Sequence, residues 1–185
     1  MENTFHIQWH ITDRCTLRCL HCYQDSFSSK SELSISSLEK IFSNIVTFVE
    51  SRGQKLVIDI TGGEPFLYKN WKELLSIVYH HPTTKRTGVI TNGFLFDDEN
   101  IKFLEGFKNL TIKISAEGVN KKTFELFRGE GTYEKFIRIC ERLKTSLPER
   151  EKILMFTLTK ENIEEISYLF DFITEYRFSA FILER

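Results

Sequence analysis

Short apolar runs alternate with segments of helical period along the whole chain, and this repeat is its dominant pattern. Strand-like runs are predicted at residues 7–12, 56–61, 87–91, 110–115, 153–159 and 179–183. Between them, apolar residues recur at the three- and four-residue spacing of amphipathic helices, and the fourth helix is predicted to break at residues 128–131. Strands that alternate with helices favour parallel β/α units, because parallel neighbours need a crossover connection.

Several of these strands alternate polar with apolar residues, which bears on the choice of fold. Right-handed crossovers leave two main options, an open doubly wound sheet or part of a barrel. A sheet covered on both faces is apolar throughout, whereas four strands here carry a polar face, formed by His6, Gln8, His10 and Thr12; Asp59 and Thr61; Lys113, Ser115 and Glu117; Thr157 and Thr159. A closed eight-stranded barrel fills its interior with branched side chains, so a polar interior suits six strands better. We predict an α/β fold, a partial TIM-like (β/α)6 barrel of parallel strands, with a sheet that has one partly solvated face as the alternative.

Length and charge limit what this chain does. With 185 residues and 41% hydrophobic content, residues 1–185 are expected to form one domain. A formal net charge of -1 gives no basic field, so neither nucleic acid nor a membrane is expected as a partner. The N-terminus lacks the cationic start and apolar run of a signal peptide, and no segment approaches a membrane span. We therefore expect a cytoplasmic protein, in which clustered cysteines are more often ligands or catalysts than disulfide partners.

Three of the four cysteines lie on the loop that follows the first predicted strand. Cys15, Cys19 and Cys22 form a C-x3-C-x2-C pattern at the carboxyl end of that strand, where sites gather in parallel α/β folds. Structural zinc usually takes four ligands in C-x2-C pairs, and no second pair exists here; His21 as a fourth zinc ligand is geometrically awkward beside Cys22. Thiolates also hold iron–sulfur clusters, and three of them leave one of four irons without a protein ligand. Cys140 lies on an apolar helical stripe and is predicted to be a buried structural thiol.

A second motif, Gly62-Gly63-Glu64-Pro65, ends the second predicted strand. Glycines permit a close approach of the backbone and unusual φ angles, and a carboxylate suits an ammonium group. Asn92 and Ser115 end the next two predicted strands, so their polar side chains are expected to converge on the same site. For Thr157, on the fifth strand, a role in the site and a purely structural role are equally well supported.

Together these residues resemble the radical S-adenosylmethionine (radical SAM) enzyme superfamily, most closely its peptide-maturase (SPASM-type) branch. Residues 15–22 are similar to its C-x3-C-x-φ-C motif, with His21 in the place of the aromatic residue that lies against adenine, or else simply packing the loop. Residues 62–65 resemble the element that receives the methionyl amino group. The resemblance implies a [4Fe-4S] cluster on Cys15, Cys19 and Cys22. It further implies that S-adenosylmethionine is bound by His21, Gly62, Gly63, Glu64, Pro65, Asn92 and Ser115.

Three further stretches resemble the same branch. Residues 115–118 are similar to a Ser-x-Asp-Gly pattern, with Glu117 where aspartate is usual, and residues 128–133 and 157–162 are similar to the interrupted fourth helix and the fifth strand of peptide maturases. Arg128 is then either a fork-like donor to the cosubstrate carboxylate or a solvated arginine at a helix end. Asn162 with Glu165 is predicted to cap the helix that follows.

The resemblance implies an enzyme that reductively cleaves S-adenosylmethionine to a 5′-deoxyadenosyl radical, which abstracts hydrogen from a substrate. The substrate is expected to be a peptide, with a small molecule as the other option, and the electron donor a one-electron reductant such as flavodoxin or ferredoxin. No side chain is assigned as a catalytic acid or base. The cysteine-rich C-terminal extension of the maturases is absent from residues 1–185. Three alternatives stay open: a piece of a longer protein, a core completed by a partner, and a minimal core. The alternatives are a non-catalytic iron–sulfur or zinc module for binding or electron transfer, and an inactive fragment.

Overall fold

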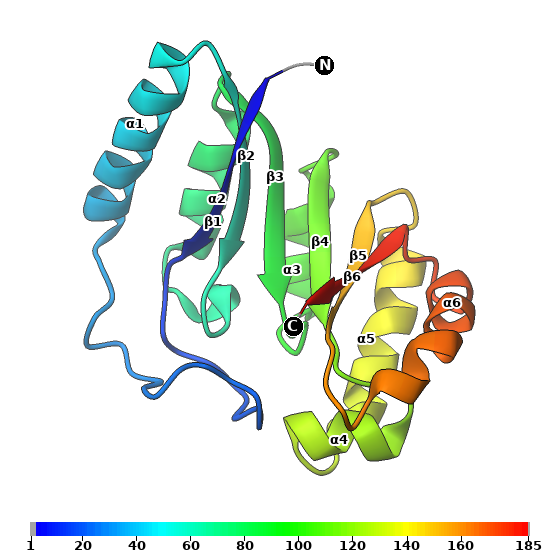
Figure 1. The fold of residues 1–185 in the computed structure, drawn as a ribbon. Helices are drawn as coiled ribbons and strands as arrows, with labels where there is room; N and C mark the ends of the chain where they lie inside the picture. Colours follow the sequence, from blue (N-terminus) through cyan, green and yellow to red (C-terminus); the bar gives the residue numbers. More distant parts are fainter. Residues whose placement is uncertain (1–2, 185) are drawn as a thin grey trace. The chain divides into compact units, whose positions relative to one another are not determined.

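The computed structural model describes residues 3–184, in which strands and helices alternate as the hydrophobic pattern predicts (Figure 1). The strands are β1 (Thr4–His10), β2 (Lys55–Thr61), β3 (Thr84–Thr91), β4 (Leu110–Ser115), β5 (Lys152–Thr157) and β6 (Ala180–Glu184). The helices are α1 (Ile35–Ser51), α2 (Trp71–His80), α3 (Asp98–Glu105), α4 (Lys121–Arg128), α5 (Tyr133–Ser146) and α6 (Ile166–Glu175), with short 3-10 helices η1 (Pro65–Leu67) and η2 (Ile163–Glu165). The predicted break in the fourth helix separates α4 from α5. No helix among residues 3–184 has the length and hydrophobicity that crossing a bilayer requires.

The strands form one sheet whose spatial order, β1-β2-β3-β4-β5-β6, is the order along the chain. β1 pairs in parallel with β2 from Thr4–Lys55 to His10–Thr61, and β5 pairs in parallel with β6 from Ile153–Ala180 to Thr157–Glu184. In a doubly wound sheet the order reverses at a switch point, whereas a (β/α) barrel adds each strand beside the last. The strand order therefore excludes the doubly wound alternative and confirms the partial TIM-like α/β fold.

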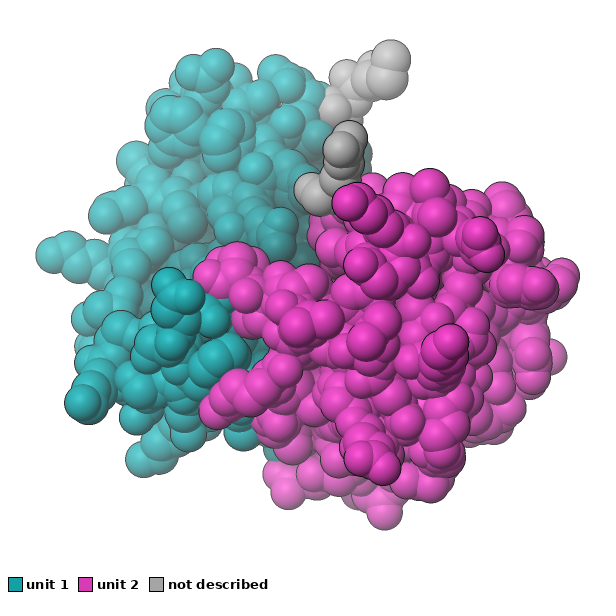
Figure 2. Space-filling view, turned by 60° about the horizontal axis from the view of Figure 1, so that its bottom comes forward, with its two compact units in different colours: residues 1–15, 24–90, 109–111 teal, residues 16–23, 91–108, 112–185 magenta. Residues whose placement is uncertain are grey.

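The chain divides into two compact units, which Figure 2 distinguishes by colour. Unit 1 comprises residues 1–15, 24–90 and 109–111, and unit 2 comprises residues 16–23, 91–108 and 112–185. The cysteine loop is shared between them, because Cys15 ends a segment of unit 1 whereas Cys19 and Cys22 belong to unit 2.

In unit 1, strand β2 has an apolar and a polar face. Leu56 and Ile58 have no exposed surface, and α1 contacts both α2 and β2. On the polar face, His6 Nε2 lies 2.7 Å from Asp59 Oδ2, and Asp59 is buried. The alternation of polar and apolar residues along β1 and β2 therefore predicts their two faces correctly.

In unit 2, a column of stacked aromatic rings joins three helices. The ring centroids of Phe124 and Phe136 are 4.4 Å apart, and those of Phe136 and Phe172 are 5.7 Å apart with an interplanar angle of 2°. Aromatic pairs at these separations add to the free energy gained by burying their area. The column fixes α4 against α5 and α6, and so determines where the C-terminal end of α4 lies. Cys140 on α5 is fully buried, as predicted.

Candidate functional site

The Gly-Gly-Glu-Pro turn at the end of β2 packs against the backbone that leads into the cysteine loop. The Gly63 N–H donates to Thr12 O and the Glu64 N–H donates to Arg14 O, each at 2.7 Å. A Cβ atom on Gly62 would lie 2.5 Å from Thr12 O, and one on Gly63 would lie 2.5 Å from Arg14 O. The predicted close approach of the backbone is confirmed. Neither glycine uses the other freedom of glycine, since neither has a positive φ.

Glu64 places a carboxylate in the interior of unit 1, where it has no exposed surface. Its Oε1 accepts a hydrogen bond of 3.4 Å from the Phe66 N–H at the start of η1, and Pro65, which lacks an N–H, takes the first position of that helix. Burying a carboxylate costs free energy unless it is paired with donors or a cation. The buried position of Glu64 therefore depends on donors such as the Phe66 N–H.

The residue before Cys15 is fixed by the segment between the cysteine loop and α1. Arg14 Nε donates to Glu32 Oε1 at 2.8 Å, and its Nη2 donates to Leu67 O. The Thr12 hydroxyl donates to the same Glu32 oxygen. The approach to Cys15 is therefore held both by the turn at 62–64 and by an ion pair.

In unit 2, residues 16–23 pack on the C-terminal end of α4. The Leu20 N–H donates to Phe127 O at 2.8 Å, and the His21 ring stands edge-on to the Phe127 ring at 5.6 Å. The Cys22 N–H donates to Cys19 O at 3.1 Å, which closes a turn between these cysteines. All three loop thiols are half-buried. Among residues 3–184, no group of three His, Cys, Asp or Glu side chains is positioned to hold a metal ion.

Glu117 joins this loop to α4 through a buried ion pair. Arg128 donates from Nε to Oε2 at 2.5 Å and from Nη2 to Oε1 at 2.9 Å, and His21 Nε2 lies 3.2 Å from Oε1. The side chains of Arg128 and Glu117 are only 5% and 2% exposed, respectively, so the alternative of a solvated Arg128 is wrong. The carboxylate that Arg128 contacts belongs to the protein itself. His21 packs the loop in this structure.

The electrostatics of Glu117 follow from these contacts. Burial by itself raises the pKa of the Glu117 carboxyl, but the charge of Arg128 and the hydrogen bonds from His21 and Arg128 outweigh burial and lower it. The carboxylate is therefore ionised at neutral pH. From the sequence, Glu117 is assigned to a polar strand face and noted as a departure from the Ser-x-Asp-Gly pattern, but its pairing with Arg128 is missed. The available signal is an acidic residue and an arginine in two neighbouring motifs.

Asn92 is the predicted strand-end residue that the structure brings to the cysteine loop. Its Nδ2 donates to the Thr16 hydroxyl at 3.2 Å, and its Oδ1 accepts from the Phe94 N–H at 2.9 Å. Ser115 and Thr157 end β4 and β5, and both are half-buried. Asn92 is thus a strand-end candidate whose side chain bonds to the loop.

Asn162 is a second residue whose role differs from its prediction. Its Nδ2 donates to Glu117 O at 2.9 Å and to Thr157 O at 2.8 Å, and Asn162 has no exposed surface. Glu165 Oε2 accepts from the Val119 N–H at 2.7 Å. Asn162 takes the predicted N-cap position before η2, but the predicted side-chain capping bond is wrong, since its amide bonds to the backbone that follows β4 and to the end of β5 instead.

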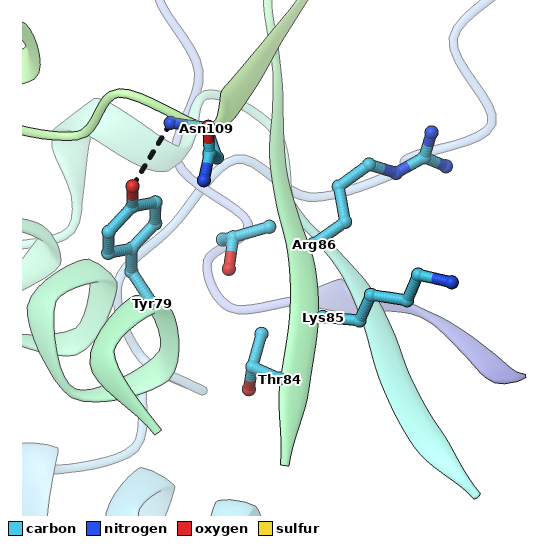
Figure 3. Close-up of a pocket in the computed structure, with 6 residues that line it drawn as sticks. Tyr79, Thr84, Lys85, Arg86 and Asn109 are labelled. Atoms are coloured by element: carbon cyan, nitrogen blue, oxygen red, sulfur yellow. Dashed lines mark hydrogen bonds between the residues drawn. The ribbon is translucent and has the colours of Figure 1, made fainter. Parts of the chain in front are cut away.

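A separate hollow of about 150 Å³ lies in unit 1 at the start of β3. Tyr79 accepts a hydrogen bond of 3.0 Å from the Asn109 N–H, while the side chains of Lys85 and Arg86 extend away from Tyr79 (Figure 3). Thr84 begins β3, so this hollow lies at the amino end of the strand, opposite the end where Asn92 follows it. It takes no part in the candidate site.

Solved structures share this fold over nearly all of the chain. Streptococcus suis SuiB bound to its precursor peptide SuiA superposes with a TM-score of 0.80 at 19% identity, over 99% of this chain and 39% of SuiB. SuiB bound to S-adenosylmethionine gives a TM-score of 0.77. At this identity the likeness establishes the fold alone.

Curated relatives share sequence over most of the chain. The Fe-coproporphyrin III synthase of Methanosarcina barkeri is 30% identical over 173 residues, which are 91% of this chain and 41% of the relative. AlbA of Bacillus subtilis, an antilisterial bacteriocin subtilosin biosynthesis protein, is 33% identical over 141 residues, 75% of this chain and 30% of AlbA. The chain thus spans less than half of either relative.

The donor groups of this chain match, in type and order along the sequence, the cofactors that one superfamily uses, although the three thiols are not arranged around a metal position in this structure. Radical SAM enzymes use a [4Fe-4S] cluster and S-adenosylmethionine, and this chain offers three thiols on one loop and a buried carboxylate beside two closely packed glycines. His21 Nδ1 is buried without a hydrogen-bond partner among the described residues, and a donor group of a ligand would satisfy it. Residues 9–173 match the family model of the Radical SAM superfamily. The chain therefore belongs to the radical SAM superfamily of enzymes.

Proposed function

We propose that this chain is the catalytic core of a radical SAM enzyme that modifies a peptide. In this proposal Cys15, Cys19 and Cys22 bind the [4Fe-4S] cluster, and residues 62–65 bind S-adenosylmethionine. The observation that carries the assignment is the pair of hydrogen bonds from the 62–65 turn to residues 12–14. These bonds place the second motif directly against the chain that leads into the first.

The proposed roles follow from the chemistry of each group. When bound, the reduced cluster supplies the electron that cleaves S-adenosylmethionine to methionine and a 5′-deoxyadenosyl radical, which takes hydrogen from the substrate. Three thiolates leave one iron open to the cosubstrate. Glu64 would receive the methionyl ammonium group, and Asn92, Ser115 and His21 would supply polar contacts. The protein binds and orients, because the hard chemistry belongs to the cofactors.

Two comparisons support a peptide as the substrate. SuiB, whose fold is similar, was solved with a precursor peptide bound, and AlbA is named for the biosynthesis of a bacteriocin. The similarity of residues 128–133 to the interrupted helix of peptide maturases points the same way. The relative that makes Fe-coproporphyrin III favours a small molecule instead. We propose a flavodoxin or ferredoxin as electron donor and the cytoplasm as location, where reducing conditions keep the thiols available.

The enzyme assignment is tested by product analysis. The protein is reconstituted anaerobically with iron and sulfide, reduced with dithionite and mixed with S-adenosylmethionine, and 5′-deoxyadenosine is measured by chromatography. We expect 5′-deoxyadenosine in proportion to the clusters of four irons. A protein that carries such a cluster but releases no 5′-deoxyadenosine would show that the proposed function is wrong.

The substrate class needs a separate experiment. A low-molecular-weight extract of the source cells is divided, and one half is digested with a broad-specificity protease that is then removed. We expect the undigested half to increase the formation of 5′-deoxyadenosine, and the digested half to have lost this effect. Stimulation that survives digestion would instead favour a small molecule.

A further inference from the structure

Glu117 follows the end of β4 and is held through both its side chain and its backbone. Both carboxylate oxygens accept hydrogen bonds from Arg128, and the backbone oxygen of Glu117 accepts one from the buried Asn162 at 2.9 Å. Two parallel hydrogen bonds from one planar guanidinium group restrict the orientation of the Glu117 carboxylate. Side chain and backbone of Glu117 are therefore both fixed before any ligand binds.

His21 is the loop residue that contacts this fixed carboxylate. Its Nε2 lies 3.2 Å from Glu117 Oε1, and it directly precedes Cys22. A hydrogen bond to an ionised carboxylate is roughly twice as strong as one between neutral groups. Beside it, the Leu20 N–H bonds to Phe127 O, so two successive loop residues are tied to the same helix end.

We propose that Glu117 is a positioning residue that anchors His21 and thereby fixes residues 16–23, the part of the loop that carries Cys19 and Cys22. Ordering a free loop costs conformational entropy. In an anchored loop this entropy is lost when the protein folds and not when the cluster binds. Residues 16–23 are then ordered before the cluster arrives. The inference rests on the proposed role of Cys19 and Cys22 as cluster ligands, but the anchoring itself belongs to the protein without cluster.

Two substitutions of His21 separate the anchor from simple ring packing. His21→Phe keeps an aromatic ring against Phe127 and removes the donor to Glu117. His21→Gln removes the ring and keeps an N–H donor of similar reach. Both leave the Glu117–Arg128 pair intact, so neither strands a buried charge.

The first measurement is amide hydrogen exchange in the cluster-free full chain, followed at residues 16–23. We expect exchange of the Leu20 amide to be about tenfold faster in His21→Phe than in the wild type, and close to wild type in His21→Gln. Unchanged exchange in His21→Phe, or faster exchange in His21→Gln than in His21→Phe, would overturn the proposal, because ring packing would then hold the loop.

The second measurement uses the reconstituted protein. We expect His21→Phe to alter the electron paramagnetic resonance spectrum of the reduced cluster and to lose iron to a chelator about tenfold faster, while His21→Gln keeps the wild-type behaviour. Spectra and iron loss that are identical in folded His21→Phe and the wild type would contradict the anchor. If exchange changes as expected but the wild type binds no cluster of four irons, the ligand assignment is wrong and the anchor stands.

Two controls complete the design. Glu134→Gln breaks the exposed Lys121–Glu134 ion pair between α4 and α5 and should change neither measurement. The double variant Glu117→Leu with Arg128→Met removes the anchor without leaving a buried charge. We expect it to speed exchange at residues 16–23 as His21→Phe does, while the amides of α5 stay protected. Slow exchange at residues 16–23 in this folded double variant would also overturn the proposal.

Discussion

Arg128 donates two hydrogen bonds to the Glu117 carboxylate, from Nε to Oε2 at 2.5 Å and from Nη2 to Oε1 at 2.9 Å. The pair is nearly inaccessible to water. A buried ion pair adds little net stability over apolar side chains of the same shape, but breaking it from one side is costly because an unpaired charge stays inside.

The first prediction concerns the difference between removing one partner of this ion pair and replacing both. Arg128→Met should lower the free energy of unfolding by about 3–5 kcal/mol, because it leaves the Glu117 carboxylate buried without the charge of Arg128 and with only the weaker contact of His21. Adding Glu117→Leu should recover most of this loss. Denaturant unfolding of the cluster-free protein provides both values, with Glu134→Gln as a surface control that stays within about 0.5 kcal/mol of wild type. A loss below about 1 kcal/mol in Arg128→Met would mean that the pair is not desolvated in solution.

The second prediction is a pH dependence. The pKa of Glu117 is lower in the folded protein than its ordinary value of 4.5. Its ionised form therefore contributes stability that is fully present above 4.5 and is lost as the pH falls through the lower, folded pKa. Wild type should thus lose more stability on acidification below 4.5 than the double variant Glu117→Leu with Arg128→Met. Thermal unfolding across this range measures the difference, and equal acid sensitivity of the two proteins would argue against a depressed pKa.

The third prediction concerns the glycine turn. In Gly63→Ala the new Cβ would meet Arg14 O, a backbone atom that moves only with the chain leading to Cys15. We expect a loss of stability of about 1–3 kcal/mol and less bound iron after reconstitution. Gly106→Ala is the matched control, since its Cβ would lie 3.4 Å from the nearest atom in a right-handed helical backbone, and it should be neutral or slightly stabilising. Equal melting temperatures and iron contents in the two variants would show that residues 12–14 adjust freely.

The fourth prediction divides the cysteines three to one. Cys19→Ala should lose the cluster after reconstitution, whereas Cys140→Ala should keep it. Cys140 is fully buried on α5, and burial raises the pKa of its thiol, which disfavours the thiolate that iron requires. Iron and sulfide content with the visible absorbance of the cluster measure the outcome. Loss of iron in a folded Cys140→Ala protein would contradict the assignment.

The fifth prediction concerns Asn162. Aspartate replaces asparagine well at a helix cap, where the side chain only accepts. Here Asn162 donates to two carbonyl oxygens, Glu117 O and Thr157 O, so Asn162→Asp would set a carboxylate against them. We expect Asn162→Asp to lower the melting temperature more than Asn162→Ala does. The opposite order would restore the interpretation as a cap.

The regular features of this molecule are those that the sequence predicts well. The alternation of polar and apolar residues predicts β1 and β2 with the polar face that carries Asp59, because a strand of period two exposes its faces to different surroundings. The close packing at Gly62 was likewise predictable, since a glycine pair at a strand end is typical of backbone approach.

Contacts made by side chains across elements could not be predicted in the same way. The position of Arg128 at the end of α4 suggests that its side chain is exposed to solvent. In the structure Phe124 stacks on Phe136, α4 packs against α5, and the Arg128 side chain is buried. Helical periodicity identifies which face is apolar and does not tell which neighbour the face meets. The same holds for Asn162, whose side chain donates to Glu117 O, 45 residues earlier in the chain, as well as to the nearby Thr157 O.

The hydrogen bonds between the 62–64 turn and residues 12–14 also limit which segments of this chain can be exchanged with those of a relative. The turn packs so closely on residues 12–14, which lead into the cysteine motif, that Gly62 and Gly63 have no room for a methyl group. A chimera that imports a cysteine loop from a relative should therefore import that relative's glycine turn as well. Exchanging one without the other would bring together two backbone segments that are not shaped to pack against each other.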